Sequence, residues 1–128
     1  MPHLIVEYSE NLESVLDMSA FCDHLRKTAC RIEAFPSAGI RVRAFSARHY
    51  SIADGNPAHG FIDISVRLRA GRPQEVKEAA AQMLFEEARE FVADYMQTNP
   101  LARSLEMRDS DPALSPKTGS IREHLKED

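Results

Sequence analysis

Positively charged residues are fewer than negatively charged residues in this chain, and the chain has no long hydrophobic run. The 128 residues include 16 Lys and Arg against 20 Asp and Glu, which gives a formal net charge of −4. A chain of this charge has no general attraction to phosphate backbones, so we expect no nucleic acid partner. The apolar run at residues 4–6 is too short to cross a bilayer, and no charged segment of a secretion signal precedes it. We therefore expect a cytoplasmic protein that binds no membrane.

Cysteine is also scarce, with only Cys22 and Cys30 present. Both fall in a segment with helical spacing of apolar residues, where a rise of ~1.5 Å per residue separates them by roughly 12 Å. Bridged Cα atoms lie within about 7 Å of each other, so a disulfide between the two is excluded. We predict two buried free thiols, as suits a reducing compartment.

Familiar catalytic and metal-binding motifs are missing as well. The five histidines show no H-x-x-x-H spacing, so the sequence gives little support for a metal site. Neither a G-x-S-x-G motif, a P-loop nor a G-x-G-x-x-G motif occurs. Any chemistry must therefore come from residues outside these motifs.

The hydrophobic pattern predicts an alternation of strands and helices. An apolar, β-prone run at residues 3–8 is typical of a strand covered on both faces. An amphipathic helix follows, with Asp17 as its N-cap and its end near Arg31. Alternating residues predict strands at 40–45 and 61–69, separated by a turn-rich loop at 53–60. Pro73 at a first helical position introduces a long helix that Pro100 bounds, and residues 102–108 form a last strand.

This order predicts an α/β (α+β) fold made of two tandem β-α-β units. Right-handed crossovers would give parallel strand pairs, with both helices on one face of a four-stranded sheet. We expect one domain over residues 1–128, with units at 1–58 and 59–108 and a C-terminal tail at 109–128. The second sheet face carries Phe61, which favours a cover from another subunit. A solvated face is the alternative, because polar residues line up on it: Asp63, Ser65, Arg67 and Arg69. The tail is either a disordered terminus or a segment that packs on a neighbouring subunit.

Pro2 is the first residue with catalytic potential. A small residue in second position permits removal of the initiator methionine, which would leave a secondary amine at the start of the first strand. An ordinary α-amino group has a pKa of about 7.7–8.0, and burial or nearby cations lower it. Such a nitrogen would serve as a general acid and base near neutral pH. Taken alone, Pro2 is equally compatible with an incidental proline.

Three arginines could hold an anion. Arg72 lies in AGRP, before the long helix, where backbone N–H groups and the helix dipole favour negative charge. Gly71 beside it would allow a ligand to approach the backbone. Arg41 and Arg43 share one side of the second strand and face either a pocket or water. A guanidinium at any of these positions could pair with a carboxylate through two hydrogen bonds.

Together these segments resemble a known family. MPHLIVEYSENL, FPSAGIRVRAF, ADG and AGRPQEVKEAAAQMLFEEAREF are similar to 5-carboxymethyl-2-hydroxymuconate isomerases of the tautomerase superfamily. The similarity covers residues 2–106. It implies a homotrimer of tautomerase-like subunits and no cofactor. It also implies a small unsaturated polycarboxylate as substrate, from the breakdown of homoprotocatechuate and 4-hydroxyphenylacetate.

The resemblance assigns roles to individual residues. Pro2 would be the catalytic base, and Arg41 and Arg72 would bind a substrate carboxylate and stabilise the dienolate that forms. Arg43 would support Arg41 in binding substrate. The reaction would move a proton along a conjugated 2-hydroxy acid to give its 2-oxo tautomer. Alternatives are a hydratase or dehalogenase of small unsaturated acids with the same fold and base, and a non-catalytic anion-binding module in which the proline is incidental.

Overall fold

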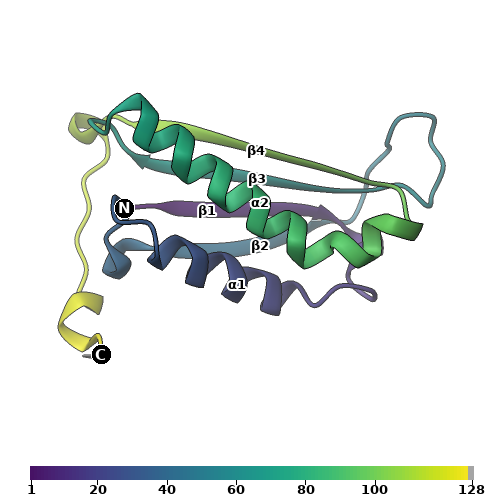
Figure 1. Cartoon of the computed structure of the whole chain (residues 1–128), viewed down its shortest axis with the longest axis horizontal. Helices are drawn as coiled ribbons and strands as arrows, with labels where there is room; N and C mark the ends of the chain where they lie inside the picture. Colours follow the sequence, from purple (N-terminus) through teal and green to yellow (C-terminus); the bar gives the residue numbers. More distant parts are fainter. Residues whose placement is uncertain (127–128) are drawn as a thin grey trace.

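The computed structural model describes residues 1–126 and contains one sheet with two long helices (Figure 1). The elements are β1 (His3–Ser9), α1 (Met18–Cys30), β2 (Arg41–Ala47), β3 (Gly60–Arg69), α2 (Gln74–Thr98) and β4 (Leu101–Ser110). Short 3-10 turns occur at Glu10–Leu12, Ser37–Gly39, Pro112–Leu114 and Ile121–His124. The predicted order of strands and helices is confirmed, and the last strand extends two residues beyond Arg108.

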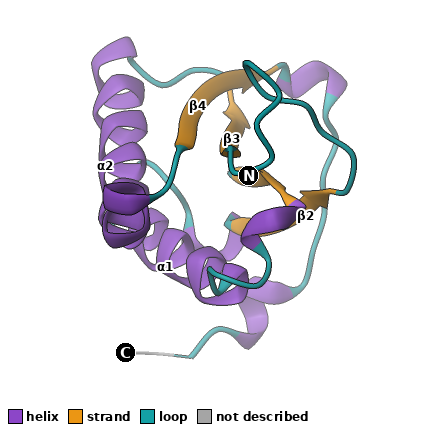
Figure 2. Cartoon of the chain, turned by 90° about the vertical axis from the view of Figure 1, so that its right-hand side faces the viewer, coloured by secondary structure: helices purple, strands orange, loops and turns teal. Residues whose placement is uncertain are grey.

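The strands lie in the order β2-β1-β3-β4. Each β-α-β unit contributes a parallel pair, and the antiparallel pairing of β1 with β3 joins the two units. Both helices lie on the same side of the sheet, as Figure 2 shows in a view along the strands. The predicted fold class is therefore confirmed. The register places His3 between Arg41 of β2 and Arg67 of β3.

The helices begin where the sequence provides a start signal. The side chain of Asp17 caps α1 by accepting a hydrogen bond from the Ala20 backbone N–H at 3.0 Å. Pro73 is the N-cap of α2, and Gln74 is the first helical residue, one position later than predicted. Proline tolerates this place because its missing N–H has no partner inside the helix.

The core lies between the helices and one face of the sheet. The central strands bury alternate residues against Phe21 and Leu25 of α1 and against α2: Leu4, Val6, Tyr8, Ile62, Ile64, Val66 and Leu68. The residues of α2 that are buried against the sheet are Ala80, Leu84, Ala88 and Val92. Val76 and Met83, apolar residues of the same helix, are 38% and 41% exposed. A long helix on a flat sheet buries only the row of side chains that faces the strands.

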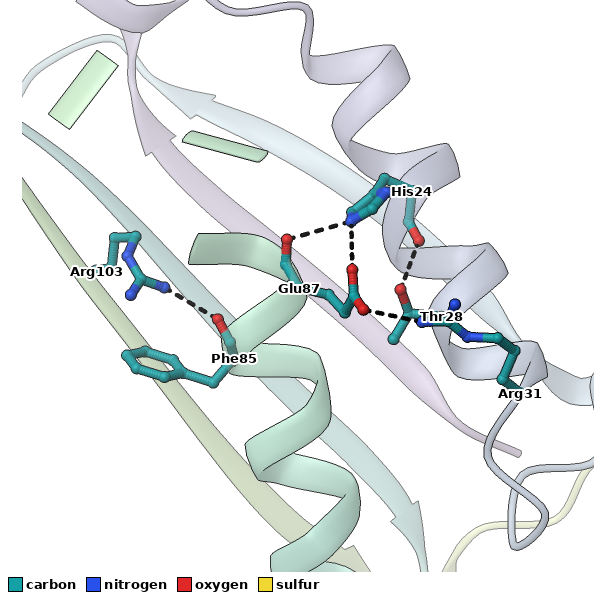
Figure 3. Close-up of polar contacts among 6 residues, drawn as sticks. All are labelled: His24, Thr28, Arg31, Phe85, Glu87 and Arg103. Carbon is teal, nitrogen blue, oxygen red and sulfur yellow. Dashed lines mark hydrogen bonds and ion pairs between the residues drawn. The ribbon is translucent and has the colours of Figure 1, made fainter. Parts of the chain in front are cut away.

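Polar contacts tie α2 to its neighbours outside the apolar core (Figure 3). Glu87 of α2 accepts a hydrogen bond from Arg31 at 3.1 Å and lies 3.1 Å from Nε2 of His24 on α1. On β4, the guanidinium of Arg103 lies 4.2 Å from the centre of the Phe85 ring and donates to the Phe85 carbonyl at 3.2 Å. Burial lowers the pKa of Arg103. These contacts fix α2 across both units of the sheet.

In the described part of the chain, no helix covers the other face of the sheet. Its central apolar residues, Ile5 and Phe61, are half-buried, and Phe45 on β2 is 56% exposed. The prediction that the first strand is covered on both faces is therefore wrong for the single subunit: β1 buries Leu4 and Val6 but leaves Glu7 exposed. An apolar centre on an open sheet face is the feature expected of a surface that a further subunit covers.

Both cysteines are free, but only one is shielded from water. Cys22 is partly buried, and burial raises the pKa of its thiol. Cys30, the last residue of α1, is exposed, so the prediction of two buried thiols is wrong for it. Within residues 1–126, no helix combines the length and the apolar character that a membrane span requires.

Candidate active site

The chain begins at one end of the sheet, where β1 and β2 start and β3 and β4 finish (Figure 1). Pro2 is buried there, and its carbonyl accepts a hydrogen bond from the Arg41 backbone N–H at 3.0 Å. The turn that leads into β2 packs closely against it. A Cβ atom on Gly39 would lie 3.4 Å from Pro2 Cδ and 3.2 Å from Met1 Cγ. The position of Pro2 is thus fixed by backbone contacts on one side.

Two pockets adjoin the start of the chain. The first, of about 360 Å³, lies over the ends of β3 and β4 and is lined by His3, Arg67, Arg69 and the first part of the tail. The second, of about 310 Å³, lies at the start of β2 and is lined by Gly39, Arg41 and the later part of the tail. Met1 and Lys117 line both, so the two pockets are neighbours at the N-terminus.

Among the residues that the structure describes, those lining these pockets include several cations and no acid. Arg67, Arg69 and Lys117 line the first, and Arg41, Lys117 and Arg122 line the second. Within residues 1–126, the ion pairs of the protein lie elsewhere and involve none of these five side chains. A protein with a net charge of −4 therefore gathers uncompensated positive charge at one end of its sheet. Such a cavity favours an anionic ligand.

Burial and these cations weaken the basicity of the groups between them. The pKa of the Met1 α-amino group falls from 8.0 to about 6, first through burial and then through Lys117, Arg72 and Arg69. Burial, followed by the charges of Arg67, Arg43 and Arg41, lowers the pKa of His3 to about 4. Both changes have the same physical reason, because a further positive charge is costly in this cavity. The N-terminal amine is therefore largely uncharged at neutral pH.

Two of the predicted arginines lie beside the first residues of the chain. Arg41 donates from Nη1 to Met1 Sδ at 2.8 Å and to the Gly39 carbonyl at 3.1 Å, and it lines the second pocket. Arg43 lies 3.1 Å from His3 Nδ1 through its Nη1. The structure thus brings Pro2, Arg41 and Arg43 to one end of the sheet.

Arg72 occupies a different position. Its Nε donates to the Ala34 carbonyl at 2.9 Å and its Nη1 to the Arg69 carbonyl at 2.8 Å, which ties the segment before β2 to the end of β3. It lines neither pocket, although its charge contributes to the lowered pKa of the N-terminal amine. Gly71 next to it has a φ of +118° with open space around the missing Cβ. The positive φ, and not a close contact with another group of the chain, explains why a glycine occupies this position.

Sequence reasoning missed His3, Gly39, Arg67, Arg69 and Lys117. Arg67 and Arg69 were recognised only as polar residues of β3, because the antiparallel pairing that brings Arg67 opposite His3 leaves no local signal. The repeated arginines on one side of β3 were the available clue, since they match Arg41 and Arg43 on β2. Lys117 lies in the tail, where no periodic pattern exists. Among residues 1–126, no cluster of three or more His, Cys, Asp or Glu side chains has the arrangement of a metal site.

Comparison with known proteins gives a consistent result. The family model described as 5-carboxymethyl-2-hydroxymuconate isomerase matches residues 2–125. A 5-carboxymethyl-2-hydroxymuconate Delta-isomerase from Escherichia coli is 31% identical over 121 residues, covering 94% of this chain and 96% of that protein.

Solved structures agree with this result. A crystal structure of a 5-carboxymethyl-2-hydroxymuconate delta-isomerase superposes with a TM-score of 0.90 at 29% identity, covering 100% of this chain and 95% of that one. A fused 4-OT, described as a symmetric trimer, shares the fold with a TM-score of 0.66 at 20% identity and covers 86% of this chain and 88% of that one. The predicted resemblance is confirmed.

Proposed function

Because this chain belongs to the 5-carboxymethyl-2-hydroxymuconate isomerase family, within the tautomerase superfamily, we propose that it converts 5-carboxymethyl-2-hydroxymuconate to its conjugated 2-oxo tautomer. The reaction relocates one proton along a conjugated dienol and needs no redox change. The setting that we propose is the breakdown of homoprotocatechuate, since the family resemblance implies this substrate.

One observation carries the chemical part of the proposal: the Met1 α-amino group, whose pKa is lowered, lies beside cations that have no acidic partner within residues 1–126. A pKa of about 6 for an amine at this place supports a base that is available at neutral pH. The surrounding guanidinium and ammonium groups suit a substrate with several carboxylates. Base and anion-binding groups therefore occur in the same cavity.

In the mechanism that we propose, the base is the ring nitrogen of Pro2 after removal of Met1. With Met1 in place this nitrogen is a tertiary amide and has no useful basicity, and the Met1 side chain occupies the space beside Arg41. Removal of Met1 transfers the free amine to Pro2 and joins the two pockets, which Met1 lines in common. Pro2 then takes the proton of the 2-hydroxyl group and returns a proton further along the conjugated chain.

The arginines act on the negative charge that develops in between. Arg41 would bind a substrate carboxylate and stabilise the dienolate, because loss of Met1 frees the side of its guanidinium that now contacts sulfur. Arg43 would support Arg41 in binding substrate through its hydrogen bond to His3. Arg72 would act mainly through its charge, since its donors engage two backbone carbonyls within the subunit. We propose Pro2, Arg41 and Arg72 as catalytic residues and Arg43 as an additional substrate-binding residue.

We also propose that the enzyme works as a homotrimer. The open sheet face with Ile5, Phe45 and Phe61 supports this assembly, as does the symmetric trimer of the fused 4-OT that shares the fold. Light scattering of the purified protein at working concentration tests it. A monomer of 14.4 kDa would overturn the trimer.

The activity is tested by following the ultraviolet absorbance of the dienol during its consumption. Protein whose intact mass shows a start at Pro2 should accelerate the reaction, and protein that retains Met1 should lose about 10²- to 10⁴-fold in rate, the usual contribution of a general base. Arg41→Met should raise KM and lower kcat. Lys27→Ala, a surface change on α1, serves as control and should leave both constants unchanged.

Equal rates with and without Met1 would refute Pro2 as the base. No acceleration of this substrate by Pro2-initiated protein, together with turnover of another small unsaturated acid, would instead favour the hydratase or dehalogenase alternative. Binding of such acids without any turnover would favour the anion-binding module.

A further inference from the structure

The C-terminal tail forms part of the wall of both pockets. After β4 ends at Ser110, the chain runs along the end of the sheet and passes the N-terminus (Figure 1). Pro112, Ser115 and Pro116 line the first pocket, and Thr118, Gly119 and Ile121 line the second. Of the tail residues at these two pockets, Lys117 alone lines both. The tail therefore places one ammonium group at the junction of the two cavities.

Within residues 1–126, no acidic group neutralises Lys117. None of the described residues that line the two pockets is acidic, and Lys117 takes part in none of the ion pairs in this part of the chain. After burial, Lys117 is the largest cause of the lowered pKa of the Met1 α-amino group. The ammonium group thus lies close to the start of the chain, next to Pro2, whose ring nitrogen the proposed function makes the base.

The other cations divide into two groups on either side of this junction. Arg67 and Arg69 line the first pocket, and Arg41 lines the second. A substrate that spans both pockets would meet guanidinium groups at its two ends and the ammonium of Lys117 between them. Lysine suits such a place because a compact charge on a flexible stem can follow a branch of the ligand.

We propose that Lys117 is a specificity-determining residue that binds a third, branching carboxylate, so that the site prefers tricarboxylates to dicarboxylates. The inference rests on the proposed function, in which arginines hold the other carboxylates. It gives the tail a role in substrate selection, and it explains why a proline-containing segment without apolar periodicity lies across the end of the sheet.

The test is equilibrium binding by calorimetry at low salt, with tricarballylate and glutarate as probes. Glutarate has the same carbon chain between its two carboxylates and lacks only the central carboxylate. Pro2-initiated full-length protein should bind tricarballylate more tightly than glutarate. Lys117→Met should weaken tricarballylate binding about tenfold or more, the usual effect of losing a charge-assisted hydrogen bond, and glutarate binding much less.

Two further variants make the test specific. Lys117→Arg keeps the charge and should retain the preference for tricarballylate. Lys126→Met removes an exposed lysine from the same tail outside both pockets and should change neither affinity.

Binding does not depend on turnover, so the outcomes separate the two proposals. Unchanged tricarballylate affinity in Lys117→Met, an equal loss for both acids, or no preference in the parent protein would each overturn the role of Lys117. A preference that Lys117→Met abolishes, in a protein that fails to isomerise 5-carboxymethyl-2-hydroxymuconate, would support Lys117 and refute the proposed function.

Discussion

Arg43 donates a hydrogen bond from Nη1 to Nδ1 of His3 across a distance of 3.1 Å. A guanidinium group has no acceptor, so His3 Nδ1 carries no proton and the neutral ring holds its proton on Nε2. His3 lines the first pocket, and its pKa of about 4 keeps the ring neutral at physiological pH. The site therefore contains an uncharged N–H donor among cations.

We predict that NMR titration of His3 gives a pKa near 4, well below the ordinary 6.5. Arg43→Met should raise this pKa, because it removes a neighbouring positive charge and the donor that holds Nδ1 unprotonated. The value should stay below 6.5, since burial is the largest cause of the shift. Arg89→Met, a change on the surface of α2, should not move it. A pKa of 6.5 or above in the parent protein would contradict the arrangement.

A second prediction concerns the contact between the two helices in Figure 3. The Glu87 side chain, only 25% exposed, pairs with His24 of α1 and with Arg31, the C-cap of α1. Its loss leaves Arg31 without this acceptor and leaves His24 Nε2 with only the Glu87 backbone carbonyl at 3.2 Å. We expect Glu87→Ala to lower the free energy of unfolding by about 1 kcal/mol, the upper part of the range for partly exposed ion pairs. Urea unfolding measures this. Glu90→Ala, an exposed acid on the same helix, should cost less than about 0.5 kcal/mol, and an equal effect of the two changes would refute the role of Glu87.

Most of the fold could be predicted because its signals are local. Alternation from Ile62 to Leu68 specifies a strand with one buried face, and Asp17 and Pro73 mark the helix starts within a residue. Whether a side chain at the end of a helix or strand is exposed to water could not be predicted in this way. Cys30 lies in α1 but is its last residue, and its side chain is exposed to water.

The candidate site could be predicted only in part, because it depends on contacts between distant segments. Pro2 and Arg41 could be proposed from the sequence. Removal of Met1 would expose the amine of Pro2, and the family resemblance assigns a role to both residues. Arg67 comes beside His3 only through the antiparallel pairing of the two β-α-β units, which short-range patterns do not encode. Lys117 lies beside the N-terminus in an irregular tail, where no periodic pattern predicts the path of the chain.

The close approach of Gly39 to Pro2 leads to a third prediction. A Cβ at position 39 would lie 3.4 Å from Pro2 Cδ, an ordinary contact, so Gly39→Ala in Pro2-initiated protein should lower kcat/KM only slightly. Gly39→Val adds branches that the contact cannot accept, and we expect a loss of about 10²-fold because a catalytic group displaced by about 1 Å becomes ineffective. Ala79→Val, on the exposed side of α2, adds the two γ-methyl groups of valine far from the site and should have no effect. Equal rates for Gly39→Val and the parent protein, at unchanged melting temperature, would show that Pro2 needs no such support.

The last prediction follows from the lowered pKa of the N-terminal amine. Only the uncharged amine is a base, so kcat/KM should rise with pH as the amine loses its proton and then level off. Since burial, Lys117, Arg72 and Arg69 lower the pKa of the Met1 amine to about 6, and the same groups would surround the Pro2 amine, we expect the rising limb well below pH 8.

Arg72→Met removes one of these charges and should move the limb to higher pH, because the protonated amine is then less disfavoured. Replacement of Lys27, on the surface of α1, should leave the limb in place. A limb at pH 8 or above in the parent protein would mean that the cavity does not depress the basicity of Pro2. A limb unmoved by Arg72→Met would mean that Arg72 acts only through its two hydrogen bonds to backbone carbonyls, as a structural tie between β3 and the segment before β2.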